Sequence, residues 1–252
     1  MPQFDDDIFL GTAQTYMGTN SNSNLGDPAP MDLGVGPVGR IYVWDTVPAA
    51  TATNNLATSQ TPAGSGSLTL TAGSGVTSVI RSDGTTAYQL DCPRAVSVTQ
   101  VAAGTSRTFT VTGYDYYGQN MSEAITSTAG STVNGKKAFF QVTGITVNGA
   151  TTTAVTVGNT SILGCPVRFT DRGYLDSVGW NNTLAEDAAT TVVADSTSPA
   201  TTTTGDVRGT ILPSSACDGT KRLVVGLYLP ALAAGPNATR IGALGVNQNL
   251  VS

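Results

Sequence analysis

The chain has 252 residues, a formal net charge of −5 and an isoelectric point near 4.5. This balance argues against a nucleic-acid-binding protein, because such proteins need a basic face to displace counterions from phosphates. Only 12 % of residues are charged and 40 % are hydrophobic, while Thr, Gly, Val and Ala dominate. Helix-favouring surface residues are scarce, so the composition predicts an all-β fold whose polar faces carry hydroxyls and amides. The length allows one large or two modest domains, and we expect two.

Residues 1–30 are polar with scattered aromatic residues and lack periodicity, which predicts an extended N-terminal arm. An acidic triplet at residues 5–7 stands where a secretory signal would need positive charge before an apolar core, so we expect synthesis in a cytoplasm. The longest apolar patch, residues 227–235, is broken by Pro230 and is too short to span a bilayer. No membrane association is expected. The apolar residues that the arm offers as candidate partner contacts are Phe4, Ile8 and Phe9.

The first convincing strand is predicted over residues 38–47, between a Gly-Pro pair and Pro48. A Thr-, Asn- and Ser-rich linker follows to residue 66. Strand after strand at roughly ten-residue spacing, separated by Gly-rich or Cys-Pro turn signals, is typical of a β-sandwich. These short strands are predicted at residues 67–71, 77–81, 86–90 and 95–102.

Residues 107–158 carry the clearest pattern of the chain. Apolar residues recur there mostly at every second position, with Thr, Ser and Gln between them, which predicts half-buried antiparallel strands joined by tight turns. The block contains little that could perform chemistry. The alternating residues are Phe109, Val111, Phe140, Val142, Ile145, Val147, Val155 and Val157.

Beyond residue 158 the predicted strands are weaker until residues 206–212 and 222–229. The segment 222–229 matches the first strand in length and bulk, so we expect the two to pair in one sheet. This predicts a discontinuous base β domain over residues 31–66 and 166–252, with an Ig-like antiparallel β-sandwich over residues 67–165 inserted in it or joined to it. Weaker strands are predicted at residues 166–170, 174–180 and 189–194, and residues 196–205 are a low-complexity loop.

The chain contains no histidine, which removes the commonest general base and the usual partner of a Ser or Cys nucleophile. Glu123, in the strand of residues 121–126, is expected to be a solvated carboxylate. The acidic pair Glu186 and Asp187 could act with Asp171 or Asp176 as in a glycosidase, but the stretch lacks the aromatic density of a sugar cleft. We expect a protein that is not an enzyme and has no catalytic residue.

No cofactor or metal site is expected either. The glycine pattern at residues 34–39 matches a dinucleotide-binding motif, but a strand follows it where the motif requires a helix, and Pro37 removes an amide donor. Asp115 with Asn120, and the acidic triplet at residues 5–7, lack the alternating oxygen-ligand spacing of a calcium loop. They are interpreted as solvated charge.

The cysteines Cys92, Cys165 and Cys217 are too widely spaced for a local metal knuckle. One alternative is a disulfide plus a reactive thiol. The favoured alternative is three buried thiols that pack as small hydrophobic residues, because a reducing cytoplasm disfavours disulfides.

The turn at residues 113–120 gathers three tyrosines at one end of the predicted sandwich. Tyrosines are good contact residues, because they offer a large area and a polar tip at low entropic cost. The alternative is that at least one packs as a sandwich corner. The candidate partner contacts of this turn are Tyr114, Tyr116 and Tyr117.

The run FTVTGYDYYGQNMSEAI at residues 109–125, followed by GKKAFFQVTGITVNGATTTAVTVG at residues 135–158, resembles a module that recurs in virion proteins of tailed bacteriophages. The resemblance lies in a strand ending in TG with a following Asp, a polar turn with Gly, and later strands of the form ITV-G and V-VG. It covers a minority of the chain and is a pattern of strands and turns, without a catalytic signature.

The resemblance implies a non-enzymatic virion component, namely a decoration or cement protein on the capsid exterior. Its implied partner is the major capsid protein, and its implied state is a homo-oligomer, a dimer or trimer, at a symmetry axis of the shell. Such a protein would be made in the cytoplasm of the host bacterium and reside on the virion. The alternatives are a tail or portal-proximal adaptor, a virion protein that binds host glycans, and a carboxylate-based glycan hydrolase.

Overall fold

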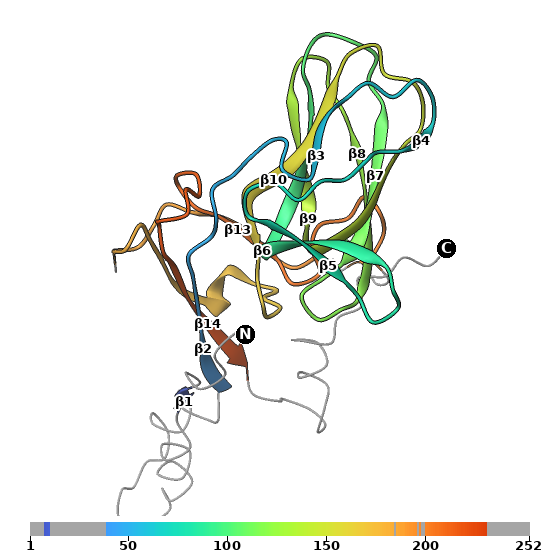
Figure 1. Cartoon of the computed structure of the whole chain (residues 1–252). Coiled ribbons are helices and arrows are strands. Elements are labelled where there is room, and N and C mark those ends of the chain that lie inside the picture. Colours follow the sequence, from blue (N-terminus) through green and yellow to red (C-terminus); the bar gives the residue numbers. More distant parts are fainter. Residues whose placement is uncertain (1–7, 11–38, 184, 196, 198–199, 231–252) are drawn as a thin grey trace, which may run out of the picture.

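A computed structural model of the chain describes residues 8–10, 39–183, 185–195, 197 and 200–230. The fold is all-β, as the composition predicted, and its strands pair antiparallel. The only helical element among the described residues is a 3-10 turn, Arg172–Tyr174. Figure 1 shows two bodies of strands, one built around β6 to β10 and the other around β2 and β14.

The strands fall into a four-stranded sheet, in the order β1-β2-β14-β11, and a ten-stranded sheet, in the order β12-β13-β10-β6-β9-β7-β8, to which β3, β4 and β5 add as side pairings. Their bounds are β1 Ile8–Leu10, β2 Gly39–Thr46, β3 Ala57–Gln60, β4 Gly66–Ser67, β5 Val76–Ile80, β6 Thr86–Gln100, β7 Thr108–Tyr114, β8 Asn120–Thr126, β9 Thr132–Val147, β10 Val155–Gly164, β11 Leu175–Trp180, β12 Thr190–Val192, β13 Thr210–Leu212 and β14 Leu223–Pro230.

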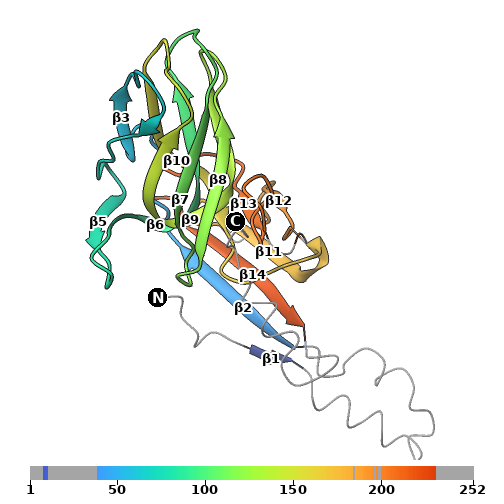
Figure 2. The ribbon, with the colours of Figure 1, turned by 90° about the vertical axis from the view of Figure 1, so that its right-hand side faces the viewer.

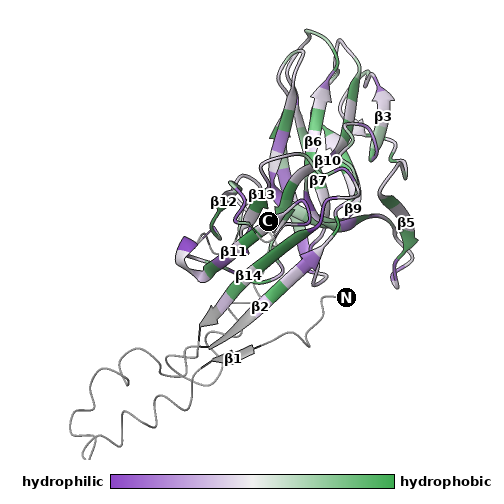
Figure 3. Ribbon diagram, turned by 90° about the vertical axis from the view of Figure 1, so that its left-hand side faces the viewer, coloured by the Kyte–Doolittle hydropathy of each residue, from purple (hydrophilic) through white to green (hydrophobic). Residues whose placement is uncertain are grey.

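The expected pairing of the first strand with the last is confirmed. β14 pairs β2 antiparallel along its whole length, from Leu223 opposite Thr46 to Pro230 opposite Gly39. Green segments run along β14 and β6 in Figure 3, where the colour marks hydrophobic residues. The two ends of the described chain are therefore joined through one sheet.

The ten-stranded sheet curls (Figure 2), and buried apolar residues of its strands form one cluster. The predicted alternation is confirmed in β7 and β8, where every second residue is buried. Seven of the eight alternating residues of the block at 107–158 are buried, and the eighth, Phe140, is half-buried. A clean period of two is what a strand with one covered face requires.

Two clusters of buried apolar residues occupy the interior. Core 1 lies inside the curled sheet and includes Phe109, Phe139 and Ile145. Core 2 lies against the four-stranded sheet and includes Trp44 and Trp180. β6 and β10 contribute residues to both cores, so the cores are joined by continuous strands. The division into domains at residues 67 and 165 stays a prediction.

β6 is a single strand of 15 residues, whereas two strands separated by a Cys-Pro turn were predicted. The turn prediction was wrong because Pro93, which has no N–H to donate, lies where the β6–β9 register shifts between Gln89 and Arg94. The two strands that flank β6 are also irregular near Ser97. From Ala95 to Ser97, β6 advances two residues while the paired residues of β9 are four apart. From Arg94 to Val96, β6 again advances two residues while the paired residues of β10 are four apart. Such bulges bend strands, and here they lie where the chain passes from core 1 to core 2.

Three other expectations need correction or lie outside the description. Residues 166–170 form no strand, although Phe169 N–H donates to the Arg208 carbonyl at 3.1 Å. The strand predicted at 206–212 is confined to β13. In the region of the predicted arm, Ile8–Leu10 pairs with β2, and residues 1–7 and 11–30, with Phe4, lie outside the described residues.

A buried ion pair joins the turn after β7 to the segment before β13, two distant parts of the ten-stranded sheet. Arg208 Nη1 donates to Asp115 Oδ2 at 2.6 Å, and the side chains are 3 % and 2 % exposed. Asp115 begins the turn between β7 and β8, whereas Arg208 precedes β13. Charges removed from water are tolerated when they are paired and hydrogen-bonded, and a single one left alone is costly.

We expect the substitution Arg208→Ala to lower the free energy of unfolding by about 3 kcal/mol or more, because it leaves the buried Asp115 carboxylate without its cation. The control is Arg222→Ala, which removes the partner of Asp45 in a pair whose side chains are 52 % and 40 % exposed and should cost far less, because water screens an exposed pair. Urea unfolding at neutral pH measures both. Equal losses of unfolding free energy in the two variants would contradict the stabilising role of the buried Arg208–Asp115 pair.

Candidate functional site

The carboxylate of Asp115 holds the tyrosine turn (residues 114–120) in its conformation. Asp115 Oδ1 accepts the N–H groups of Tyr117 and Gln119 at 2.8 and 2.9 Å. Gly118 has a φ of 76°, a left-handed conformation that glycine adopts without strain. Asp115 is thus fully used by the turn and by Arg208, so the structure gives it a fold-stabilising role.

Tyr117 faces the interior. Its hydroxyl donates to the Pro166 carbonyl at 2.6 Å, and the Arg208 guanidinium lies 4.6 Å from the centre of its ring. Burial raises the pKa of Tyr117 to about 12, so the phenol keeps the proton that it donates. Tyr117 is therefore packed against the rest of the protein, and its role as a sandwich corner stays a prediction.

The other two tyrosines are also half-buried. The Arg81 guanidinium lies 3.5 Å from the centre of the Tyr114 ring. Tyr116 stands edge-on to Tyr117 at 5.4 Å and to Phe140 at 5.0 Å between ring centres. The turn is therefore docked onto the rest of the protein, and contact of these tyrosines with a partner stays a prediction.

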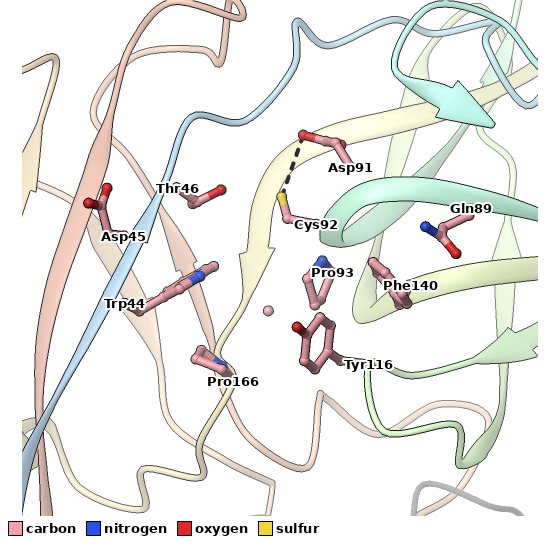
Figure 4. A pocket seen from close by; sticks show the side chains of 11 residues that line it. Trp44, Asp45, Thr46, Gln89, Asp91, Cys92, Pro93, Tyr116, Phe140 and Pro166 are labelled. Atoms are coloured by element: carbon pink, nitrogen blue, oxygen red, sulfur yellow. Dashed lines mark hydrogen bonds between the residues drawn. The ribbon is translucent and has the colours of Figure 1, made fainter. Parts of the chain in front are cut away.

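A cavity of about 370 Å³ lies beside the tyrosine turn, between β2 and β6 (Figure 4). Figure 4 shows Trp44, Asp45 and Thr46 of β2 on one side and Gln89 of β6 with Tyr116 and Phe140 on the other. The lining combines aromatic rings, prolines and a few polar groups, which is the usual character of a small-molecule site. It consists of Trp44, Asp45, Thr46, Gln89, Asp91, Cys92, Pro93, Tyr116, Phe140, Gly164 and Pro166.

Buried carboxylates hold the bulge of β9. Glu123 accepts the N–H groups of Lys136 and, at 3.2 Å, Lys137, and Asp206 accepts that of Ala138 at 3.0 Å. Three successive donors that the bulge removes from the sheet are thus satisfied by two side chains from other elements. The expectation that Glu123 is solvated was wrong, since it is 3 % exposed.

Lys137 is fully buried, and its Nζ has no hydrogen-bond partner among the described residues. Burial lowers the pKa of Lys137, while the charges of Glu123, Asp206 and Asp195 oppose this shift. Burial also raises the pKa of Glu123 to about 7, against the backbone N–H groups that favour the carboxylate. The bulge thus contains an acid that titrates near neutral pH.

This pKa predicts a stability that depends on pH. The ordinary pKa of the Glu123 carboxyl is 4.5 and its folded value is about 7, so between these values the folded state holds a proton that the unfolded chain releases. The free energy of unfolding should therefore fall by up to about 3 kcal/mol as the pH rises through this window, and level off above it.

Urea unfolding between pH 4.5 and 8 measures this fall. The variant Glu123→Gln should flatten the dependence of the free energy of unfolding on pH. If the stability of Glu123→Gln fell with pH as steeply as that of the natural protein, the pH dependence would not come from Glu123.

The two acids that were considered as a catalytic pair hold chain segments together through hydrogen bonds. Glu186 accepts the Val178 N–H at 2.8 Å and lies 3.4 Å from Arg172 Nη2. Asp187 accepts the Ser214 N–H at 2.9 Å and the Ser214 hydroxyl. Each carboxylate thus binds a backbone N–H group.

The two remaining acids of that hypothesis are likewise engaged. Asp171 accepts the Gly173 N–H at 2.7 Å and caps the 3-10 turn. Asp176 accepts the Tyr228 hydroxyl at 2.5 Å. Within the described part of the chain, no group of three or more His, Cys, Asp or Glu side chains is placed to hold a metal ion.

All three cysteines are buried, as expected, and each is a free thiol. Burial raises the pKa of Cys92 and Cys165 well above the ordinary value and also raises that of Cys217. Raised pKa values disfavour the reactive thiolate. The packing role of these residues is thus consistent with their environment.

Other residues singled out in the sequence lie wholly or partly outside the description. Residues 5–7 and 34–38 are not described, and Gly39 opens β2. Ile8 and Phe9 lie in β1, opposite Ile41 and Arg40. No local sequence pattern indicated the cavity, because its residues come from β2, β6, β9, the tyrosine turn, and the end of β10 with the segment after it.

Comparison of the chain with protein-family models, curated proteins and solved structures yields no match. Among the described residues, no helix has the length and apolar character needed to cross a membrane.

Proposed function

We propose that this protein is a non-enzymatic structural component of a bacteriophage virion, a decoration or cement protein that binds the capsid exterior and stabilises contacts between major capsid subunits. The proposal rests first on the resemblance of residues 109–125 and 135–158 to a module of phage virion proteins. In the structure these residues form β7 to β10, which pack around core 1. We interpret them as an Ig-like sandwich.

The observation that carries the proposal is that the acidic side chains bind the protein's own backbone. Asp115, Asp171, Glu123, Glu186 and Asp187 each accept at least one backbone N–H group. Carboxylates fixed in this way hold loops and bulges in place, which supports a rigid part of an assembly. A lattice-binding protein benefits from such rigidity, because little ordering entropy is then lost at each contact.

An exposed apolar edge offers a surface for the shell. Val192, Val193 and Leu212 are 53 %, 40 % and 38 % exposed, and they lie on or next to the paired strands β12 and β13. β12 is the last strand of its sheet, and the free edge of a sheet can accept a strand from a partner. We assign this shell-facing edge to contact with the major capsid protein, in a dimer or trimer.

The copy number in the virion tests the proposal. We expect quantitative mass spectrometry of purified particles, calibrated with isotope-labelled peptides of this chain, to give a copy number comparable with that of the major capsid protein. A copy number as low as that of a tail or portal ring would favour the adaptor alternative. Absence from the particles would refute a virion role.

The shell-facing edge predicts a second result. Val192→Lys places a charge on the exposed apolar edge and should weaken binding to particles that lack the protein by about tenfold or more, or about 1.4 kcal/mol. The control Ile80→Lys changes a residue of β5 that is 79 % exposed and should bind like the natural protein. Cosedimentation with particles measures both, after unfolding midpoints have shown that each variant is folded. Unchanged binding of Val192→Lys would exclude this edge.

A further inference from the structure

The cavity beside the tyrosine turn has aromatic walls and balanced charge. Asp45 is paired with Arg222 through two hydrogen bonds, and Asp91 is 3.0 Å from Arg94 Nη1. Both carboxylates of the lining are therefore neutralised by an arginine, and Asp91 also accepts the Ala49 N–H at 2.6 Å. The lining thus carries no unpaired carboxylate.

Several polar groups around the same space have no side-chain partner among the described residues. The Trp44 indole N–H, the Tyr116 hydroxyl, the Thr46 hydroxyl and the Gln89 amide nitrogen make no side-chain hydrogen bond among the described residues. By contrast, the other indole N–H of the chain, on Trp180, donates to the Ser215 hydroxyl at 2.9 Å. Hydrogen-bonding groups that converge on a cavity without using their capacity are typical of a ligand site.

We propose that this cavity binds the ring of a neutral carbohydrate. A sugar ring offers apolar C–H faces to aromatic side chains and hydroxyls around its whole edge. In Figure 4 polar residues stand on several sides, with Thr46 opposite Gln89 and Asp91 above. The volume of about 370 Å³ lies at the small end of ligand sites, which span about 300–1,000 Å³, and so fits one sugar unit with part of a second.

Other ligand classes fit the lining less well. A cation would find both carboxylates already paired with arginine, and a phosphate would meet two carboxylates. A nucleic-acid base has one hydrogen-bonding edge, whereas the polar groups here come from several walls. This inference goes beyond a shell-binding role and does not depend on it, because the cavity is separate from β12 and β13.

Nuclear magnetic resonance of the full chain tests the proposal, because the two Trp residues give two indole N–H signals, which the variant Trp44→Phe assigns. The probes are the methyl glycosides of glucose, galactose, mannose, rhamnose and N-acetylglucosamine. We expect at least one to move the Trp44 signal and leave the Trp180 signal in place, with a dissociation constant on the order of 1 mM. A disaccharide that binds more tightly than its methyl glycoside would indicate a polysaccharide as the source.

The variant Tyr116→Phe removes only the hydroxyl and should weaken binding of that glycoside roughly 2- to 13-fold, the value of one hydrogen bond. Tyr114→Phe makes the same change outside the cavity and should leave binding unaltered. The proposal is overturned if no glycoside moves the Trp44 signal at about ten times that concentration, if both indole signals move together, or if methylammonium, phosphate or adenosine binds more tightly than every sugar.

Discussion

The arrangement of this protein depends on charges that are buried where its two cores meet. Arg94, Glu123, Asp115 and Arg208 are each at most 3 % exposed. Such groups are costly to remove from water, so they are tolerated only where a partner or a set of N–H donors meets them. Because these partners come from different strands, a shift of one core against the other would leave a buried charge unsatisfied. The charges therefore fix the relative position of the cores.

The bulges and the cavity follow from this constraint. Where β9 departs from the regular ladder beside β6, the carboxylates of Glu123 and Asp206 replace the lost partners of its backbone. The bent strands leave room at the junction, and the docked tyrosine turn places Tyr116 at its margin. The cavity walls therefore come from several strands and the tyrosine turn, and a ligand there would touch core 2 through Trp44 and Cys92.

The sequence was most informative where burial follows a simple period. The alternation around Phe109 and Val111 predicted antiparallel strands with one buried face, and matching length and bulk predicted the pairing of β2 with β14. Prediction from the sequence was wrong where contacts with distant residues outweigh local conformational preferences. Pro93 was interpreted as a turn because its place at a register shift depends on a distant strand, and Glu123 was interpreted as solvated because the N–H groups that bind it belong to a bulge. The cavity could not be predicted at all, since its residues converge only in the folded chain.

The pairing of β2 with β14 also has a consequence for how the chain is made. Asp45 and Arg222 lie 177 positions apart. The edge of β2 that pairs with β14 therefore stays unpaired until nearly all of the described chain has left the ribosome. The hairpin of β7 and β8 and the ladders around it close over shorter loops and can form earlier. During that interval β2 offers the ribosome-bound chain a free edge that can pair wrongly. Polypeptides halted before residue 223 would keep that edge, which makes truncated products the species most prone to aggregate.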